Sequence, residues 1–77
     1  MTVKILGPGC SKCKTLEEKV RRIVSEHKLD AEIIKVTDMD EIMKYGIMLT
    51  PGLVIDEQIK SYGSVQKEEQ ILAWLKK

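Results

Sequence analysis

Apolar and polar residues follow one another along the chain in a pattern that predicts four strands and three helices. Between Ser11 and His27 the apolar positions lie three and four residues apart, which is the repeat of one face of a helix. Short apolar runs bounded by turn residues predict the strands. The strands are expected over 3–6, 31–36, 52–55 and 59–62, and the helices over 11–27, 39–45 and 67–75.

The order of these elements, β-α-β-α-β-β-α, predicts an α/β fold in one domain over residues 1–77. Because a helix joins the first two strands, we expect them to pair in parallel through a right-handed crossover. The strand over 31–36 is β-branched at its centre and is expected to be buried, whereas the polar strand over 59–62 is expected at an edge. The prediction is a four-stranded mixed sheet with helices on both faces.

Three local signals support the boundaries in the second half of the chain. Asp38 followed by Glu41 predicts a capping box at the start of the second helix. Gly46 is placed to terminate that helix as its C′ residue. The segment 56–58 is expected to form a hairpin turn between the last two strands, although it contains no glycine.

Cys10 and Cys13 are the residues that carry chemistry, because they lie between the first strand and the start of the first helix. Unpaired N–H groups and the positive end of the helix dipole favour the reactive thiolate there, and Lys12 adds a positive charge. Cys10 at the helix tip is expected to attack a disulfide, and Cys13, one turn further, to resolve the product. A purely structural bridge is less attractive, since so short a loop stabilises by only about 2 kcal/mol.

Composition narrows the classes of partner. The net charge is +1, so there is no electrostatic reason to expect nucleic acid or an anionic membrane surface. No apolar run reaches the ~20 residues of a membrane span, and no secretory signal is seen, so a cytoplasmic location is expected. Phe is absent, which predicts an aliphatic core with methionines filling its gaps, and Met39, Met43 and Met48 are the candidates. Met48 differs from the other two in that its loop is expected to border the active site.

A soft-metal carrier is the alternative function. Small copper-binding domains also place a CxxC between a first strand and a first helix, and two thiolates suit Cu(I). Those domains end in a strand, however, whereas this chain is expected to end in a helix. Zinc would need four ligands, and the chain offers two cysteines and the remote His27.

The motif Gly-Pro-Gly-Cys-Ser-Lys-Cys over 7–13, together with Tyr-Gly-Ile-Met-Leu-Thr-Pro over 45–51, resembles the thioredoxin superfamily. It is most similar to the small thioredoxin/glutaredoxin-like redox-active disulfide proteins of archaea and bacteria. The resemblance extends from Val3 to Leu75. It implies a thioredoxin-like fold and a thiol–disulfide oxidoreductase with Cys10 as nucleophile and Cys13 as resolving thiol.

The same resemblance implies a substrate site. Frequency alone favours a trans bond before Pro51, since only about 5–6% of X–Pro bonds are cis. The resemblance implies instead that the Thr50–Pro51 bond is cis. It implies that the Thr50 backbone pairs with an extended substrate, with Pro8 also in contact and Gly63 leaving room. The expected partners are disulfide-containing proteins and an unidentified reductase; a monomer without a cofactor is expected.

One departure concerns proton transfer. Thioredoxins carry a buried acid on the strand before the motif, and Lys4 stands at the matching spacing here. The proton acceptor for Cys13 is therefore left unassigned by the sequence.

Overall fold

The computed structural model describes residues 1–9 and 11–76, and its elements follow the predicted order. Each boundary lies within one residue of its predicted position, and all three helices are one residue shorter than expected. The elements are β1 (Thr2–Leu6), α1 (Ser11–Glu26), β2 (Glu32–Val36), α2 (Met39–Lys44), β3 (Gly52–Ile55), β4 (Gln58–Tyr62) and α3 (Glu68–Leu75).

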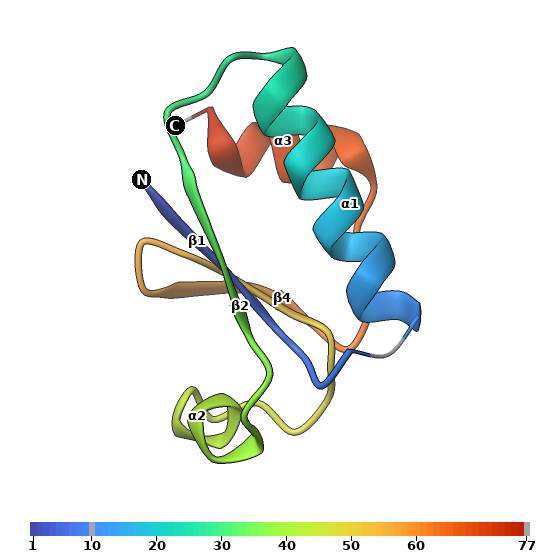
Figure 1. Ribbon diagram of the computed structural model, residues 1–77, viewed down its shortest axis with the longest axis vertical. Helices are drawn as coiled ribbons and strands as arrows, with labels where there is room; N and C mark the ends of the chain where they lie inside the picture. The colour runs from blue at the N-terminus through green and yellow to red at the C-terminus, as the bar shows by residue number, and fades with distance from the viewer. Residues whose placement is uncertain (10, 77) are drawn as a thin grey trace.

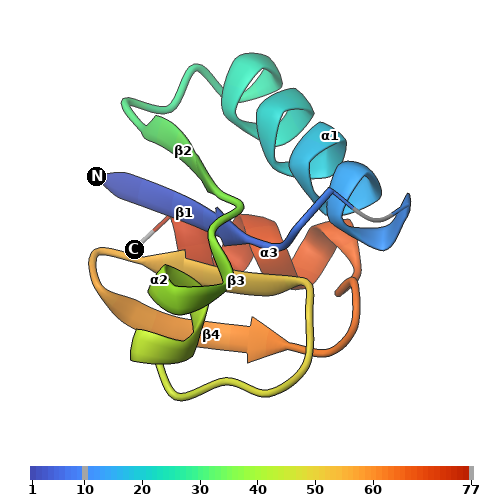
Figure 2. The same cartoon turned by 60° about the horizontal axis from the view of Figure 1, so that its bottom comes forward.

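The four strands form one mixed sheet in the order β2-β1-β3-β4 (Figure 2). β1 and β2 are parallel, and β3 is antiparallel to both β1 and β4. These pairings confirm the parallel crossover, the hairpin and the edge position of β4. The expected burial of the second strand is wrong: β2 is the other edge, and none of its residues is fully buried. Its β-branched residues fit any half-covered pleated surface and do not distinguish an edge from a centre.

Helices cover both faces of the sheet, as predicted (Figure 1). Strand side chains alternate, so Val3 and Ile5 face α1 and α3, whereas Leu6 faces α2. The larger core, between the sheet and the helices α1 and α3, consists of Val3, Ile5, Leu16, Val20, Ile23, Leu53, Ile55, Ile71 and Leu75. The smaller core, under α2, consists of Leu6, Ile42, Ile47 and Val54.

Methionines do not fill this core, so that expectation is wrong. Met39, Met43 and Met48 are 51%, 66% and 95% exposed. The first two lie on α2, which buries only Ile42, and Met48 lies in the connection to β3. A helix of six residues has one narrow buried stripe, and in α2 the branched aliphatic residue Ile42 occupies it.

The turn signals are largely confirmed. Asp38 caps α2, but its carboxylate accepts from the N–H of Asp40 (2.8 Å), while Glu41 pairs with Lys44. The reciprocal half of the capping box is therefore wrong, because Glu41 has a cationic partner one turn further along the helix. Gly46, with φ +78°, directly follows the C-cap residue Tyr45 and is therefore the C′ residue, as expected.

The hairpin between β3 and β4 turns through two residues without glycine. Asp56 and Glu57 both have positive φ, 49° and 66°, as the tightest hairpin turns require. Asp56 is held by the first residue of β1: its backbone N–H donates to the Thr2 carbonyl (2.8 Å), and its carboxylate accepts from the Thr2 N–H (2.9 Å). These hydrogen bonds to Thr2 stabilise the turn from outside the hairpin. They support a turn that the sequence predicted only weakly, because it contains no glycine.

Candidate active site

Cys13 lies in the first turn of α1 with its side chain only 5% exposed. It packs directly against Gly7, the residue that follows β1. A methyl group placed on Gly7 would overlap the Cys13 sulfur and would lie 3.1 Å from Cys13 Cβ. Position 7 must therefore be glycine for the Cys13 sulfur to occupy its observed position. Cys10, the expected nucleophile, lies outside the described residues.

Gly7 is a site residue that the sequence analysis did not single out. Its backbone N–H donates to the Val36 carbonyl (2.8 Å), so the end of β2 holds it in position. A glycine directly after a strand often marks a close approach of the backbone to another group. The position of Gly7 after the first strand could be read from the sequence. The sequence did not show that the approaching group is the Cys13 side chain.

The third segment of the site is the Thr50–Pro51 connection before β3. The peptide bond is cis, as the resemblance implies, and the frequency-based expectation of a trans bond is wrong. Pro51 is buried, and the Thr50 side chain is half-buried. The Thr50 Cβ would lie 3.9 Å from a methyl group on Gly7. Cys13, Gly7 and Thr50, from three separate parts of the chain, therefore come together.

Gly63 borders this connection from the other side. Its N–H donates to the Pro51 carbonyl (2.9 Å), and its φ is +84°, a conformation that favours glycine. A methyl group on Gly63 would lie 3.2 Å from both Cβ and Cδ1 of Leu49. The structure thus places Gly63 beside the cis-proline connection and against Leu49.

Lys12 and Pro8 are both exposed near the start of α1. The first turn of α1 contains Lys12 and no acidic residue, so no carboxylate of its own offsets the positive end of the helix dipole. The roles expected for Lys12 and Pro8 stay predictions.

Lys4 takes part in a different cluster. Its Nζ donates to the Tyr45 hydroxyl (2.8 Å) and to the Glu57 carboxylate (2.5 Å). The Glu57 carboxylate, followed by the Tyr45 hydroxyl, raises the pKa of Lys4 above its ordinary value, and Lys4 in turn lowers the pKa of Glu57. This cluster lies on the side of the sheet that α2 covers, opposite α1. Lys4 therefore ties the hairpin to α2 and carries its charge away from the helix that bears Cys13.

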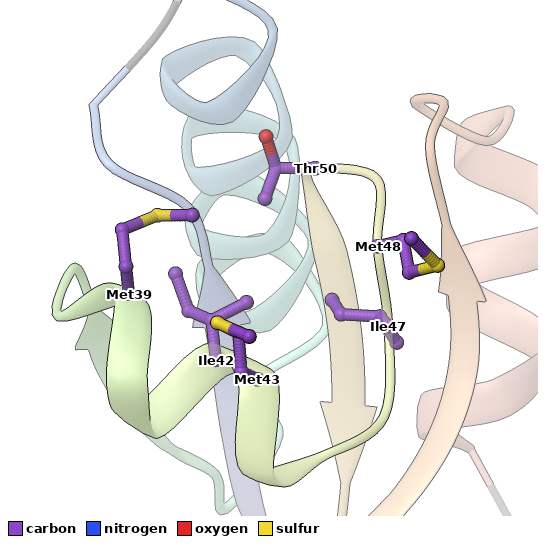
Figure 3. A pocket seen from close by; sticks show the side chains of 6 residues that line it. All are labelled: Met39, Ile42, Met43, Ile47, Met48 and Thr50. Carbon is purple, nitrogen blue, oxygen red and sulfur yellow. The ribbon is translucent and has the colours of Figure 1, made fainter.

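A small pocket of about 190 Å³ adjoins Thr50 (Figure 3). We name it the methionine pocket. Two of its methionines come from α2 and one from the connection that leads to Thr50. Its lining consists of Met39, Ile42, Met43, Ile47, Met48 and Thr50.

Within residues 1–9 and 11–76, no three His, Cys, Asp or Glu side chains gather to form a metal site. Among the helices of the same residues, none has the length and apolar character needed to cross a membrane.

A β-α-β-α-β-β-α fold with a four-stranded mixed sheet and a buried cysteine in the first turn of its first helix is that of a thioredoxin-like protein. The model of the thioredoxin domain family matches residues 1–76, so the chain belongs to this family. It is 39% identical over 71 residues to a protein called thioredoxin from Methanothermobacter thermautotrophicus, covering 92% of each chain. It is 40% identical over 76 residues to one from Methanocaldococcus jannaschii, covering 99% of this chain and 87% of that protein.

Family membership makes this chain a thiol–disulfide oxidoreductase. Proteins of this family act on disulfide-containing substrates and are returned to the dithiol by a reductase. Neither comparison supports the copper-carrier alternative.

Proposed function

We propose that Cys10 is the nucleophile and Cys13 the resolving thiol of a two-step disulfide reduction. The Cys10 thiolate attacks one sulfur of the substrate disulfide, forming a mixed disulfide and releasing the first substrate thiol. The Cys13 thiolate then attacks the Cys10 sulfur and releases the second substrate thiol. Two electrons pass from the dithiol to the substrate, and the protein is left with a Cys10–Cys13 disulfide.

The observation that carries this assignment is the burial of Cys13 against Gly7, beside Thr50. A buried thiol is poorly placed to meet an incoming substrate, but it is well placed to attack a sulfur bound next to it. Position 10 directly precedes the first residue of α1, where the helix dipole favours an anion. The proposed roles of the two cysteines are supported by the burial of Cys13 and by the place of Cys10 in the sequence.

We further propose that the substrate binds as an extended segment along the Thr50 backbone. Thr50 stands two residues before β3, outside the paired part of that strand, so its backbone is available for strand addition. Pro8 and Gly63 would flank the segment. Lys12 would stabilise the Cys10 thiolate, with the helix terminus contributing up to about 2 kcal/mol.

A reductase would restore the dithiol after each cycle. A cytoplasmic location, a monomeric state and a single domain over residues 1–77 are further parts of this proposal. The single domain is supported by the two cores that share one sheet.

The test is reduction of insulin disulfides by wild type, Cys10→Ser and Cys13→Ser, with Ser25→Ala on the exposed face of α1 as a control. We expect Cys10→Ser to be inactive and Cys13→Ser to accumulate a mixed disulfide with insulin. A redox titration of wild type should show one two-electron couple. Insulin reduction by Cys10→Ser at the wild-type rate would overturn the assignment of the nucleophile.

A further inference from the structure

Three polar side chains form a closed cluster on the face of the sheet that α2 covers, and we name it the lysine cluster. Lys4 is the middle residue of β1, Tyr45 is the C-cap residue of α2, and Glu57 belongs to the hairpin turn. Lys4 donates to both partners, and the Tyr45 hydroxyl donates to the Glu57 carboxylate (3.4 Å). Each side chain is therefore bonded to the other two, and three elements are joined at one point.

Stability alone does not account for a lysine at this position. The Lys4 side chain is only 22% exposed, in a strand that is paired on both sides, so its amine gives up part of its hydration. Ion pairs of this kind often add little to the free energy of unfolding, and apolar residues of similar size commonly do as well. Polar contacts can instead select one arrangement of the surrounding chain. The arrangement selected here is the position of Tyr45 relative to β1.

Tyr45 directly precedes the connection over 46–51, which leads to β3. Two residues of this connection, Met48 and Leu49, are 95% and 60% exposed and contribute little packing. Ile47 is buried in the smaller core and points toward α2 (Figure 3). Apolar packing is not directional, whereas a hydrogen bond fixes the orientation of its groups. The Tyr45 hydroxyl therefore orients the start of the connection in a way that the packing of Ile47 does not.

β1 is the common reference for the thiol and for this connection. It lies between β2 and β3 and pairs with both. Gly7, which follows β1, packs against the Cys13 sulfur, and Lys4 holds the Tyr45 hydroxyl. The Cys13 thiol and the start of the connection over 46–51 are therefore both placed relative to the same central strand.

We propose that Tyr45 is a positioning residue: the lysine cluster fixes the connection over 46–51 so that the Thr50 backbone can pair with a peptide substrate. The inference rests on the proposed function, in which Thr50 receives an extended segment. It goes further by assigning a part in substrate binding to three residues on the other side of α2 and the sheet, none of which touches the substrate. Loss of the Tyr45 hydroxyl lowers the fraction of molecules whose connection is in the conformation that pairs.

The size of the effect follows from the population of that conformation. The apparent affinity for a ligand falls in proportion to the fraction of molecules in the state that binds it. One ordinary hydrogen bond changes an equilibrium constant by about fivefold. Removal of the Tyr45 hydroxyl should therefore lower the second-order rate constant for a peptide disulfide by up to about fivefold.

The same change should leave the chemistry of the thiols as it is. The lysine cluster lies on the face of the sheet opposite α1, which bears Cys13, and the loss of a neutral hydroxyl changes no charge. A disulfide without a peptide backbone cannot pair with Thr50. Its rate constant should therefore be the same with and without the hydroxyl.

The test compares two disulfides with the same leaving group. One is a heptapeptide whose central cysteine is a mixed disulfide with 2-nitro-5-thiobenzoate, and the other is the mixed disulfide of that thiol with 2-mercaptoethanol. The reduced protein is mixed with each, and the second-order rate constant for release of the coloured thiol is measured. We expect wild type to react faster with the peptide. In Tyr45→Phe the ratio of the two rate constants should fall toward one, by up to about fivefold, because only the reaction with the peptide slows.

Two further variants and a control sharpen the test. Lys4→Met removes the donor that holds the Tyr45 hydroxyl, so it should lower the ratio to the same extent. The double replacement Lys4→Met with Tyr45→Phe should lower it no further, because both changes remove the same contact. Tyr62→Phe is the matched control: Tyr62 is the other tyrosine of the chain, it lies 56% exposed on β4, and its variant should keep the wild-type ratio. The ratio cancels any loss of folded protein, which slows both reactions alike.

Two outcomes would overturn the positioning role alone. A wild-type ratio in Tyr45→Phe would show that the hydroxyl does not position the connection. A fall of equal size in Tyr62→Phe would show that the effect is not specific to the lysine cluster. Equal rate constants for the two disulfides in wild type would instead contradict strand addition at Thr50 itself, and the positioning role with it.

Discussion

Replacing Gly7 by Ala should displace the sulfur of Cys13 and slow the second step of the reaction. The added methyl group would overlap the sulfur, and the Gly7 backbone is held by its hydrogen bond to the Val36 carbonyl, so neither partner has room to retreat. Overpacking of this kind costs about 1–3 kcal/mol. The lower entropy of the unfolded chain with alanine returns about 0.4–1 kcal/mol. The free energy of unfolding should fall by about 1–2 kcal/mol.

A loss of this size lowers the melting temperature of so small a domain by about 4–16 °C. The kinetic effect is measured by rapid mixing of the reduced protein with insulin, followed by acid quenching and separation of the mixed disulfide. We expect the mixed disulfide to accumulate in Gly7→Ala, because the displaced Cys13 sulfur is no longer aligned for its attack. Wild type should resolve it too quickly for it to be detected.

Gly52→Ala is the matched control. A methyl group there would also be crowded, at 2.6 Å from Cδ1 of Ile47 and 3.3 Å from Leu6, but it does not touch Cys13. It should lower the melting temperature without accumulation of the mixed disulfide. If Gly7→Ala melts and resolves like wild type, the packing of Gly7 on the Cys13 sulfur is not what positions the thiol.

Three further predictions concern charge and backbone conformation. Lys12→Glu should raise the pKa of the Cys10 thiol and lower the reduction potential, because it destabilises the thiolate; thiolate absorbance against pH measures the first effect, and an unchanged or lower pKa would refute it. Glu57→Gln should lower the melting temperature at neutral pH but not in acid. Lys4 holds the pKa of the Glu57 carboxyl below its ordinary value of 4.5. The stabilisation from this pair is therefore present above pH 4.5 and is lost as the pH falls through the lowered pKa. Equal pH profiles of stability for the two proteins would contradict this linkage. Gly63→Ala should destabilise by about 1 kcal/mol or more because of its positive φ, measured by urea unfolding, and a value near zero would show that the turn relaxes.

The features that the sequence predicted correctly are those with a local physical cause. Side-chain periodicity follows from the geometry of a single helix or strand, so the order of the elements could be predicted before their packing was known. The crossover between β1 and β2 follows from the chirality of the chain. The reactivity expected of the CxxC at the start of the first helix also depends only on residues adjacent in sequence, and it stays a prediction.

The features that were missed depend on residues far apart in the chain. Lys4 meets Tyr45 and Glu57 across 41 and 53 positions, and no local pattern records such a meeting. The burial expected for the strand over 31–36 was wrong because the position of a strand in a sheet is set by which other strands pair with it. The methionines were placed in the core because composition gives the number of apolar residues and not the face on which each lies.

The sequence by itself determined the elements and the parallel pairing of β1 with β2, and it predicts which two cysteines carry the chemistry, because backbone geometry and the helix dipole act over a few residues. Only the tertiary structure decided that Gly7 is the surface on which Cys13 rests and that Thr50, before a cis proline, lies beside it. It also decided that the methionines surround a pocket next to Thr50 instead of filling a core. Those relations arise when three segments pack at one end of the central strands β1 and β3, and close packing, not local preference, settles which atoms touch.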